Sequence, residues 1–437
     1  MKKLLYQQVQ VNTIQELKDI FISFFSYTLI GEDMKLSEIN NILKGKINKD
    51  VSFNKIKMNS KDITTNDVFL AINKGHNYID EAINNGAVGI ISEYDLDYPS
   101  IKVDNSILAL GKIANYIRNL YDIPLIAITG SVGKTTTKEL IYSVLSKKYK
   151  VLKSEKNKNN NIGCPLTLLN LDETYDIIVL EFGMNHFNEI SYLSKICNPD
   201  YAIITNIGTA HIGNLGSKKN ILKAKLEILD GMSNKNIIVN NKDKYLKKIR
   251  NAIKVDEKRL NVIYKNENEF IIDNVIFNYK YKHILPDIFI AIKVGLLFDI
   301  NLKLISEAIS EFEPIDGRLN IINREYKIID DSYNSSYESL IEGLKSLDNN
   351  FKYIVLADML ELGKFSIKYH KKVNKYLKKI KNKKVLLIGN YTKYIDGIHF
   401  ENLDELILFL KSNINKGDTI YIKGSRKFNL DIIKTRI

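Results

Sequence analysis

The stretch of sequence that decides the fold is LIAITGSVGKTTT, from Leu125 to Thr137. Its first five residues are apolar or β-branched throughout, which is typical of a strand buried on both faces of a parallel sheet. Gly130 and Gly133 then form a turn, and the residues after Lys134 have the composition of a helix that extends to about Ser146. A glycine-containing loop between such a strand and a helix favours bound phosphate, because its N–H groups and the helix N-terminus attract anions. We therefore expect a nucleotide loop of a short G-x-x-G-K-T form, and not a surface turn.

The side chains of this loop have separate expected roles. The Lys134 ammonium is expected to reach the terminal phosphates, and the Thr135 hydroxyl to bind magnesium. The expected nucleotide contacts in the loop are Gly130, Ser131, Val132, Gly133, Lys134, Thr135 and Thr136.

Two further polar residues follow buried strands. Glu181 comes directly after the apolar run 177–180, and His211 follows the run 202–205 after a turn that contains glycine. Parallel strands deliver functional groups at their carboxyl ends, and magnesium takes oxygen ligands, so Glu181 is a candidate metal ligand. Each residue also has an ordinary alternative: Glu181 as a strand-end acid, and His211 as a surface or core histidine.

The rest of the chain divides into segments. Alternating apolar runs and helical stretches from about Leu125 indicate βαβ units, and a second such alternation begins near Lys327. Asp316-Gly317-Arg318 interrupts the chain between them. The prediction is an α/β protein with three domains: a central P-loop parallel sheet with helices on both faces, a C-terminal Rossmann-like domain, and a smaller N-terminal unit. The expected boundaries are 1–33 for an N-terminal extension of unclear role, then 34–123, 124–316 and 317–437.

Composition excludes several classes of protein. The 437 residues are 45% hydrophobic, which is enough for several packed cores, but the densest apolar run, 20–30, is half the length of a membrane span. We expect a soluble cytoplasmic protein with no membrane insertion. Cys164 and Cys197 are too few for a disulfide framework and have no metal-ligand spacing. The net charge of +13 comes from scattered lysines and not from a basic stripe, so nucleic-acid binding is not expected.

Several segments together resemble one enzyme family. They are Thr129 to Glu139, Glu181 to His186, Asn206 to Ser217, Ala224 to Ile228, Gly317 to Leu319, Asp330 to Asn334, Ala357 to Gly363 and Lys423 to Arg426. This pattern resembles the Mur ligases of bacterial cell-wall synthesis. The last four segments are most similar to the members that add D-alanyl-D-alanine, and the likeness begins near Met34.

The resemblance implies an activity and its cofactors. An N-terminal domain would grip the UDP-sugar, the central domain would bind ATP, and the C-terminal domain would close with the amino component. ATP would phosphorylate the terminal carboxylate of UDP-N-acetylmuramoyl-tripeptide, and the amine of D-alanyl-D-alanine would displace the phosphate. Two Mg²⁺ ions are implied, the first held by Thr135 and Glu181 and the second with help from His211. Lys225 takes the position of a carbamoylated metal-binding lysine. Without the resemblance, Lys225 is simply a solvated helical lysine.

The resemblance also names further site residues. Lys134, Lys225 and His211 are the implied catalytic residues, and Arg318 and Asp331 the implied nucleotide contacts. The implied substrate-binding residues are Ser60, Asn157, Asn159 and Asn160. His283 to Asp287 stands where the family has a His-Asn pair at the start of a helix whose later asparagine lies beside adenine, and both asparagines are missing. Adenine recognition would then rest on Asp287, His283 or the backbone, so the base specificity is open, as is the third residue of the tripeptide.

Two other functions stay open at this point. One is a related amide ligase of the same family that adds a different amino acid. The other is a nucleotide-binding regulator without catalysis, although Lys134, Thr135, Glu181, His211 and Lys225 all favour an enzyme. A monomer is expected, but the sequence does not fix the oligomeric state.

Overall fold

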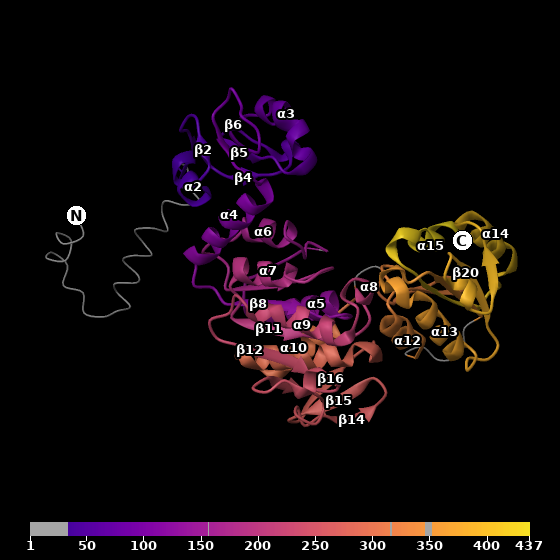
Figure 1. Cartoon of the computed structure of the whole chain (residues 1–437). Coiled ribbons are helices and arrows are strands. Elements are labelled where there is room, and N and C mark those ends of the chain that lie inside the picture. The colour runs from indigo at the N-terminus through magenta and orange to yellow at the C-terminus, as the bar shows by residue number, and fades with distance from the viewer. Residues whose placement is uncertain (1–33, 156, 315–316, 346–351) are drawn as a thin grey trace. The chain divides into compact units, whose positions relative to one another are not determined.

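The computed structural model describes residues 34–155, 157–314, 317–345 and 352–437. The expected extension 1–33, with its apolar run 20–30, lies outside the described residues, and so do residues 315 and 316, where we expect a domain boundary. The chain forms two compact units. Their elements are labelled in Figure 1. The first contains the described residues up to Asp122 together with Asn161–Thr174, and the second contains Ile123–Asn160 and Tyr175–Ile437.

The first unit is built on a five-stranded sheet of order β2-β7-β6-β5-β4, parallel except for β2. Its elements are β1 (Met34–Lys35), α2 (Leu36–Leu43), β2 (Lys46–Ile47), β3 (Ser52–Phe53), β4 (Ile56–Lys57), η2 (Ser60–Asp62), β5 (Asp67–Leu70), η3 (Asn73–Tyr78), α3 (Ile79–Asn84), β6 (Ala87–Ser92), β7 (Ser100–Lys102), α4 (Ser106–Leu120) and α6 (Gly163–Leu168). Val68 and Leu70 pack in one buried cluster with α2 and α4, whereas Phe69 packs in another with α3. Because side chains alternate along a strand, both faces of this sheet are buried.

One segment of the first unit comes from far along the chain. Helix α6 packs on α4, and Ile162, Leu166 and Leu169 lie against the same cluster as α2 and α4. The predicted linear boundaries did not include this return of the chain, since it depends on a contact between distant segments.

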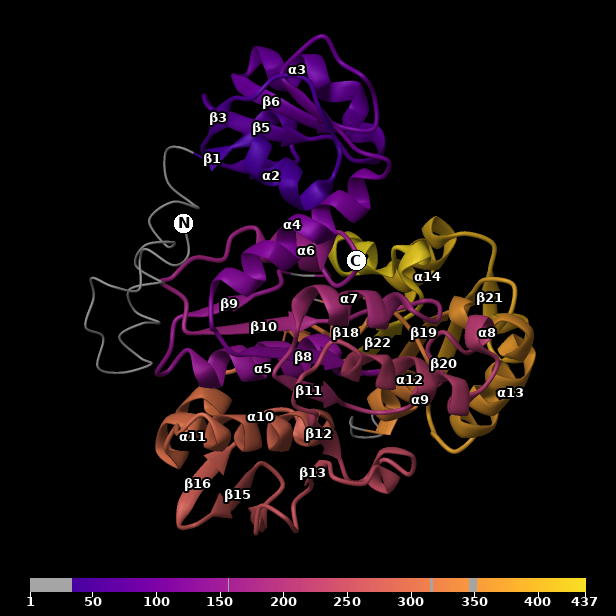
Figure 2. The ribbon, with the colours of Figure 1, turned by 60° about the vertical axis from the view of Figure 1, so that its left-hand side comes forward.

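The second unit begins with a six-stranded parallel sheet of order β13-β12-β11-β8-β10-β9 (Figure 2). Its elements are β8 (Leu125–Thr129), α5 (Lys134–Leu145), β9 (Val151–Lys153), β10 (Ile177–Glu181), α7 (Glu189–Cys197), β11 (Tyr201–Ile204), α8 (Ile212–Leu215), α9 (Lys218–Leu226), η4 (Glu227–Leu229), β12 (Asn236–Asn240), η5 (Leu246–Lys248) and β13 (Ile253–Val255). Strand β8 lies between β10 and β11, where the strand order reverses direction. Open α/β sheets bind ligands at the carboxyl ends of strands at such a point.

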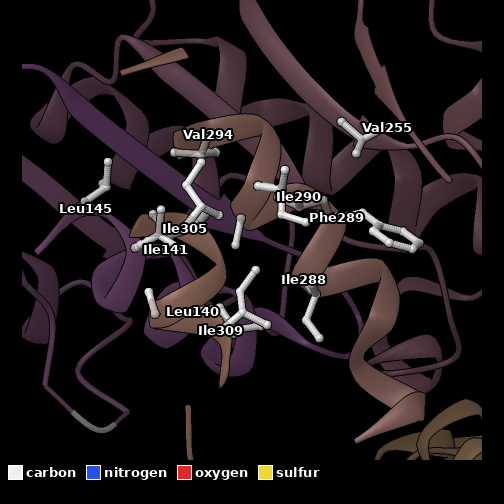
Figure 3. Close-up of a cluster of buried hydrophobic side chains, with 14 of the residues drawn as sticks. Leu140, Ile141, Leu145, Val255, Ile288, Phe289, Ile290, Val294, Ile305 and Ile309 are labelled. Carbon is white, nitrogen blue, oxygen red and sulfur yellow. The ribbon is translucent and has the colours of Figure 1, made fainter. Parts of the chain in front are cut away.

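A large apolar core covers one face of this sheet. Leu140 and Ile141 of α5 meet Ile288 of α10, together with Ile305 of α11 (Figure 3). Strand residues of the opposite parity, such as Ala127, are equally buried, so the other face is covered as well. The elements that follow β13 are β14 (Ile263–Asn266), β15 (Glu269–Ile272), β16 (Val275–Asn278), η6 (Lys282–Ile284), α10 (Leu285–Leu297) and α11 (Leu302–Ser310).

Strands β14 to β16 form a small antiparallel sheet that the sequence did not predict. Phe270 on β15 stacks on Phe277 with ring centroids 5.0 Å apart, and its edge contacts Phe289 of α10 at 5.6 Å. The hairpins therefore extend the core of the central sheet, because their aromatic residues belong to the same buried cluster.

The C-terminal part of the second unit has its own six-stranded sheet, of order β17-β18-β22-β19-β20-β21. Only the edge strand β17 is antiparallel to its neighbour. The elements are β17 (Asn320–Asn323), β18 (Lys327–Asp330), α12 (Tyr337–Lys345), β19 (Tyr353–Ala357), η7 (Leu360–Phe365), α13 (Ser366–Leu377), β20 (Lys384–Ile388), η8 (Thr392–Tyr394), β21 (Ile398–Phe400), α14 (Leu403–Asn413), β22 (Thr419–Lys423), η9 (Arg426–Phe428), η10 (Leu430–Ile432) and α15 (Ile433–Arg436). The predicted α/β class is confirmed, and the three-domain boundaries stay a prediction.

None of the described helices combines the length and the apolar character that crossing a bilayer requires.

Candidate active site

The predicted phosphate loop leaves the carboxyl end of β8 and enters α5, as expected. A Cβ on Gly130 would stand 1.8 Å from the Thr205 hydroxyl oxygen, so only glycine fits against the end of β11. Gly133 has a φ of 83°, in the left-handed region that favours glycine, and a Cβ there would meet Asp287 at 2.7 Å. The two glycines are thus needed for different reasons: Gly130 for the close approach of Thr205, and Gly133 for its backbone angle.

The loop is braced by the segment that follows β11. Ser131 N–H donates to the Asn206 carbonyl at 3.1 Å, and Val132 N–H donates to the Asn206 side-chain oxygen at 3.0 Å. These two N–H groups therefore do not point at a phosphate in this arrangement. The first turn of α5 supplies the remaining donors, because the first N–H groups of a helix have no partner inside the helix.

Two lysines, Lys134 partly buried and Lys225 buried, converge on one carbonyl of the loop. Lys134 Nζ donates to the Gly130 oxygen at 3.1 Å, and Lys225 Nζ, from α9, donates to the same oxygen at 2.9 Å. Burial lowers the pKa of both amines, and the charge of Lys134 adds to the lowering at Lys225. Lys225 has only 1% of its surface exposed, so the alternative of a solvated helical lysine is wrong. Two lysine side chains beside one loop suit the site to an anionic ligand.

Glu181 is hydrogen-bonded to two other polar side chains of the site, Thr135 and Asn159. Its carboxylate is buried and accepts from the Thr135 hydroxyl at 2.6 Å and from the Asn159 amide at 2.8 Å. The described residues contain no group of three or more His, Cys, Asp or Glu side chains that would enclose a metal. A hydroxyl and a carboxylate fit Mg²⁺ all the same, because this ion usually keeps waters and substrate oxygens as its other ligands.

Arg318 reaches this site from the start of the C-terminal part. Its guanidinium donates to the Thr135 hydroxyl oxygen at 2.8 Å and lies over the Tyr333 ring, 4.4 Å from the centroid. An aromatic face therefore holds the planar cation beside the phosphate loop.

His211 takes up an unusual backbone position at the start of α8. Its φ of 62° is left-handed, and its Nδ1 lies 3.3 Å from a Glu361 oxygen without a proper hydrogen bond within the described part of the chain. Burial lowers the pKa of the imidazole to about 4, although the Glu361 carboxylate opposes this. His211 is thus neutral at pH 7 and keeps a ring nitrogen for a ligand.

Other predicted residues lie elsewhere or have other partners. The Asp331 carboxylate is buried, with Lys423 Nζ at 2.6 Å and the Tyr421 hydroxyl at 2.9 Å. Burial raises the pKa of Asp331, and Lys423 opposes the rise. Asn157 and Asn160 are exposed on the loop after β9. Ser60 belongs to the first unit, where its buried hydroxyl donates to Glu81 at 2.8 Å.

The structure brings three further residues to the site. No role was predicted for Asn206 or Glu361, whereas Asp287 was one of the candidates for recognising adenine. Asn206 braces the loop, Glu361 faces His211, and the Asp287 carboxyl accepts from the Thr137 hydroxyl at 2.7 Å. Burial raises the pKa of Asp287 to about 7. Asn206 and Glu361 lie inside segments that carried the resemblance, which was the available signal. Asp287 was visible only as a departure from the family.

Comparison with known proteins identifies the family to which this site belongs. The family model "Mur ligase middle domain" matches residues 128–306, and "Mur ligase, glutamate ligase domain" matches 317–426. The UDP-N-acetylmuramoyl-tripeptide--D-alanyl-D-alanine ligase of Buchnera aphidicola is 34% identical over 88% of this chain and 92% of its own length. The chain belongs to the Mur ligase family.

Solved structures agree with this membership. The crystal structure of MurF from Acinetobacter baumannii superposes with a TM-score of 0.82 at 25% identity, and it covers 93% of this chain and 99% of its own. MurF from Thermotoga maritima, in complex with ADP, has a TM-score of 0.77 at 26% identity, with 87% and 96% covered. The resemblance read from the sequence of this Mur ligase is confirmed over both matched regions.

Proposed function

We propose that this Mur ligase uses ATP to join D-alanyl-D-alanine to UDP-N-acetylmuramoyl-tripeptide. The observation that carries the proposal is the phosphate loop with Lys134 and Lys225 both donating to the Gly130 carbonyl, in a chain 34% identical to a ligase of that name. The Thermotoga maritima neighbour in complex with ADP supports ATP as the nucleotide.

The reaction accounts for the positive charge. A carboxylate is a poor electrophile, so one of its oxygens first bonds to the γ-phosphorus while ADP leaves. The amine then attacks the acyl carbon, and phosphate departs with the C–O bond electrons while the nitrogen loses a proton to solvent. Lys134 and Arg318 would neutralise the phosphate groups as they approach the carboxylate, which is the main electrostatic cost of the step.

Magnesium would be held by the oxygens of Thr135 and Glu181, with Asn159 fixing the second carboxylate oxygen by its hydrogen bond of 2.8 Å. His211 is proposed to help with a second ion through its available ring nitrogen. When bound, the metal neutralises phosphate charge and orients the transferring group. Because Asn159 donates to Glu181, we assign it to the metal side of the site as well as to the substrate loop with Asn157 and Asn160.

Lys225 is proposed to carry a carbamate. Its lowered pKa favours the neutral amine, which can attack carbon dioxide: a C–N bond forms, a proton leaves the nitrogen, and a carboxylate results. This group would turn an amine that crowds Lys134 into an oxygen ligand. The crowding of the two amines on one carbonyl supports the assignment.

The remaining roles follow the domain prediction. We propose that residues 34–123 bind the UDP-sugar, with Ser60 near the uridine nucleotide, and that 317–437 bring in the amino component. Asp331, bonded to Lys423 and Tyr421, would act on the nucleotide through Lys423 and not directly.

The test is a substrate-dependence assay with the full chain. With Mg²⁺, ATP, UDP-N-acetylmuramoyl-tripeptide and D-alanyl-D-alanine, phosphate release is expected only when both substrates are present. Replacing D-alanyl-D-alanine with glutamate or a diamino acid separates the proposal from another Mur-type ligase. Nucleotide binding without phosphate release under any of these conditions would instead identify a regulator that lacks catalysis. Varying the third residue of the tripeptide in the same assay identifies the peptide that is used.

A further inference from the structure

A carboxylate from the C-terminal part is inserted into the segment that braces the phosphate loop. Glu338, in the first turn of α12, accepts from Thr209 N–H at 2.7 Å and from the Thr209 hydroxyl at 2.6 Å through the same oxygen. Its other oxygen accepts from Lys218 Nζ, at the start of α9, at 2.8 Å. Both oxygens are therefore engaged by one short stretch, 209–218.

These contacts all join parts of the second unit that are distant in sequence. Each hydrogen bond found for the Glu338 carboxylate within the described ranges comes from Thr209 or Lys218. Glu342, one turn further along α12, differs, because among the described residues its carboxylate pairs only with Lys345 of its own helix. Because all of these hydrogen bonds go to another element, Glu338 holds α12 against that element and adds no bond within α12.

The Glu338 carboxylate also lies next to the phosphate loop. A Cβ on Gly208 would stand 2.8 Å from a Glu338 oxygen and 3.0 Å from Ser131 Cβ, so glycine lets the two approach from either side. Gly208 N–H donates to the Ser131 hydroxyl at 2.8 Å. Gly208 therefore lies between the Glu338 carboxylate and Ser131 of the loop.

A second contact, between α8 and η7, fixes where the C-terminal part meets the 209–218 segment. A Cβ on Gly213 of α8 would stand 2.7 Å from the Gly363 nitrogen, so the backbones of α8 and η7 touch. Such a contact defines where the surfaces meet but supplies no directional bond, whereas charge-assisted hydrogen bonds are directional and strong. Glu338 supplies these bonds, while Arg318 and Glu361 reach Thr135 and His211 from the same C-terminal part.

We propose that Glu338 is a positioning residue, the latch that holds the C-terminal part on the 209–218 segment and so seats Arg318 beside the phosphate loop. Its effect on turnover rests on the proposed function. Its effect on the 209–218 segment does not.

The experiment measures amide hydrogen exchange and turnover on the same full-length variants. Glu338→Ala should speed exchange at the Thr209 amide at least tenfold and lower kcat at least tenfold, with a smaller change in the KM for ATP. Glu338→Gln keeps an acceptor for Thr209 but turns an N–H group toward Lys218, so it should fall between wild type and Glu338→Ala. Glu342→Ala is the matched control and should resemble wild type in both measurements.

A variant of Lys218, which pairs with Glu338, separates loss of this contact from misfolding of one variant. Lys218→Ala should reproduce part of the loss in kcat, and the double variant with Glu338→Ala should lose less than the product of the two single effects. Unchanged Thr209 exchange in Glu338→Ala, or equal losses in Glu342→Ala, would overturn the latch. If the wild type releases no phosphate with both substrates while the exchange contrast persists, the proposed function fails and the latch stands.

Discussion

Asp287 should make the stability of the nucleotide-free protein depend on pH. Its carboxyl lies in the first turn of α10, bonded to Thr137 and against Gly133. Burial raises the pKa of this carboxyl to about 7 from the ordinary value of 3.8, although Thr137 and Arg318 oppose the rise. We predict that Asp287→Asn, which removes the ionisable group but keeps the shape, is more stable than wild type at pH 8.

The sign follows from proton binding. Between about pH 4 and pH 7 the folded protein keeps a proton on Asp287 that the unfolded chain has released, so raising the pH through this window destabilises the fold. A pKa difference of this size corresponds to about 4 kcal/mol when the group is fully ionised. Part of the residue stays accessible to solvent, so we expect about half, roughly 2 kcal/mol. Asp287 belongs to the second unit, Ile123–Asn160 and Tyr175–Ile437. With an unfolding entropy of about 2.1 cal/mol/K per residue, a unit of this length shifts its melting temperature by roughly 3 °C.

The assay is a series of thermal melts from pH 5 to pH 9 without nucleotide. The difference in melting temperature between Asp287→Asn and wild type should grow as the pH rises to about 7 and then level off. Asp299→Asn, an exposed residue just beyond the same helix, is the control and should give a constant difference. A constant difference for Asp287→Asn as well would refute the reasoning.

Three further predictions concern the site and the core. Lys134→Ala should lower turnover at least ~100-fold, since one donor to the transferring phosphate contributes about 3 kcal/mol to the transition state, and exposed Lys219→Ala should not. Lys225→Ala should lose turnover and partly regain it with added short-chain carboxylic acids, which would replace the carbamate; no rescue, together with no ¹³C-carbamate signal in labelled wild type, would contradict that assignment. Phe289→Ala should cost about 3–5 kcal/mol of stability, measured by denaturant unfolding, because it removes the ring that meets Phe270 in the core.

The buried strands were predictable from the sequence because apolar runs of this length report burial on both faces. The run beginning at Leu125 matches β8, and the run 177–180 matches β10 to within a residue at its end. The antiparallel strands β14 to β16 were not predicted, because half of their residues face solvent and β14 is exposed throughout. A short exposed strand has no continuous apolar run to show.

The candidate site was predictable where one motif indicated both the place of a residue in the fold and its chemical role. Lys134, Thr135 and Glu181 come together as the strand ends indicate, since they follow adjacent strands. The meeting of Lys134 and Lys225 on a single carbonyl was not visible, because it depends on how α9 packs against the loop. Glu338 was invisible for the same reason, since nothing in its neighbourhood marks it until the fold places it against Thr209.

The return of residues 161–174 to the first unit has a consequence for how the protein is made and cut. The backbone passes between the two units three times, near residues 122, 160 and 174. A growing chain therefore cannot complete the first unit until α6 has emerged, by which time the phosphate loop and β9 have already been synthesised. A single proteolytic cut at any of the three crossings would leave the halves tied by the other two, so releasing either unit requires cuts at all three.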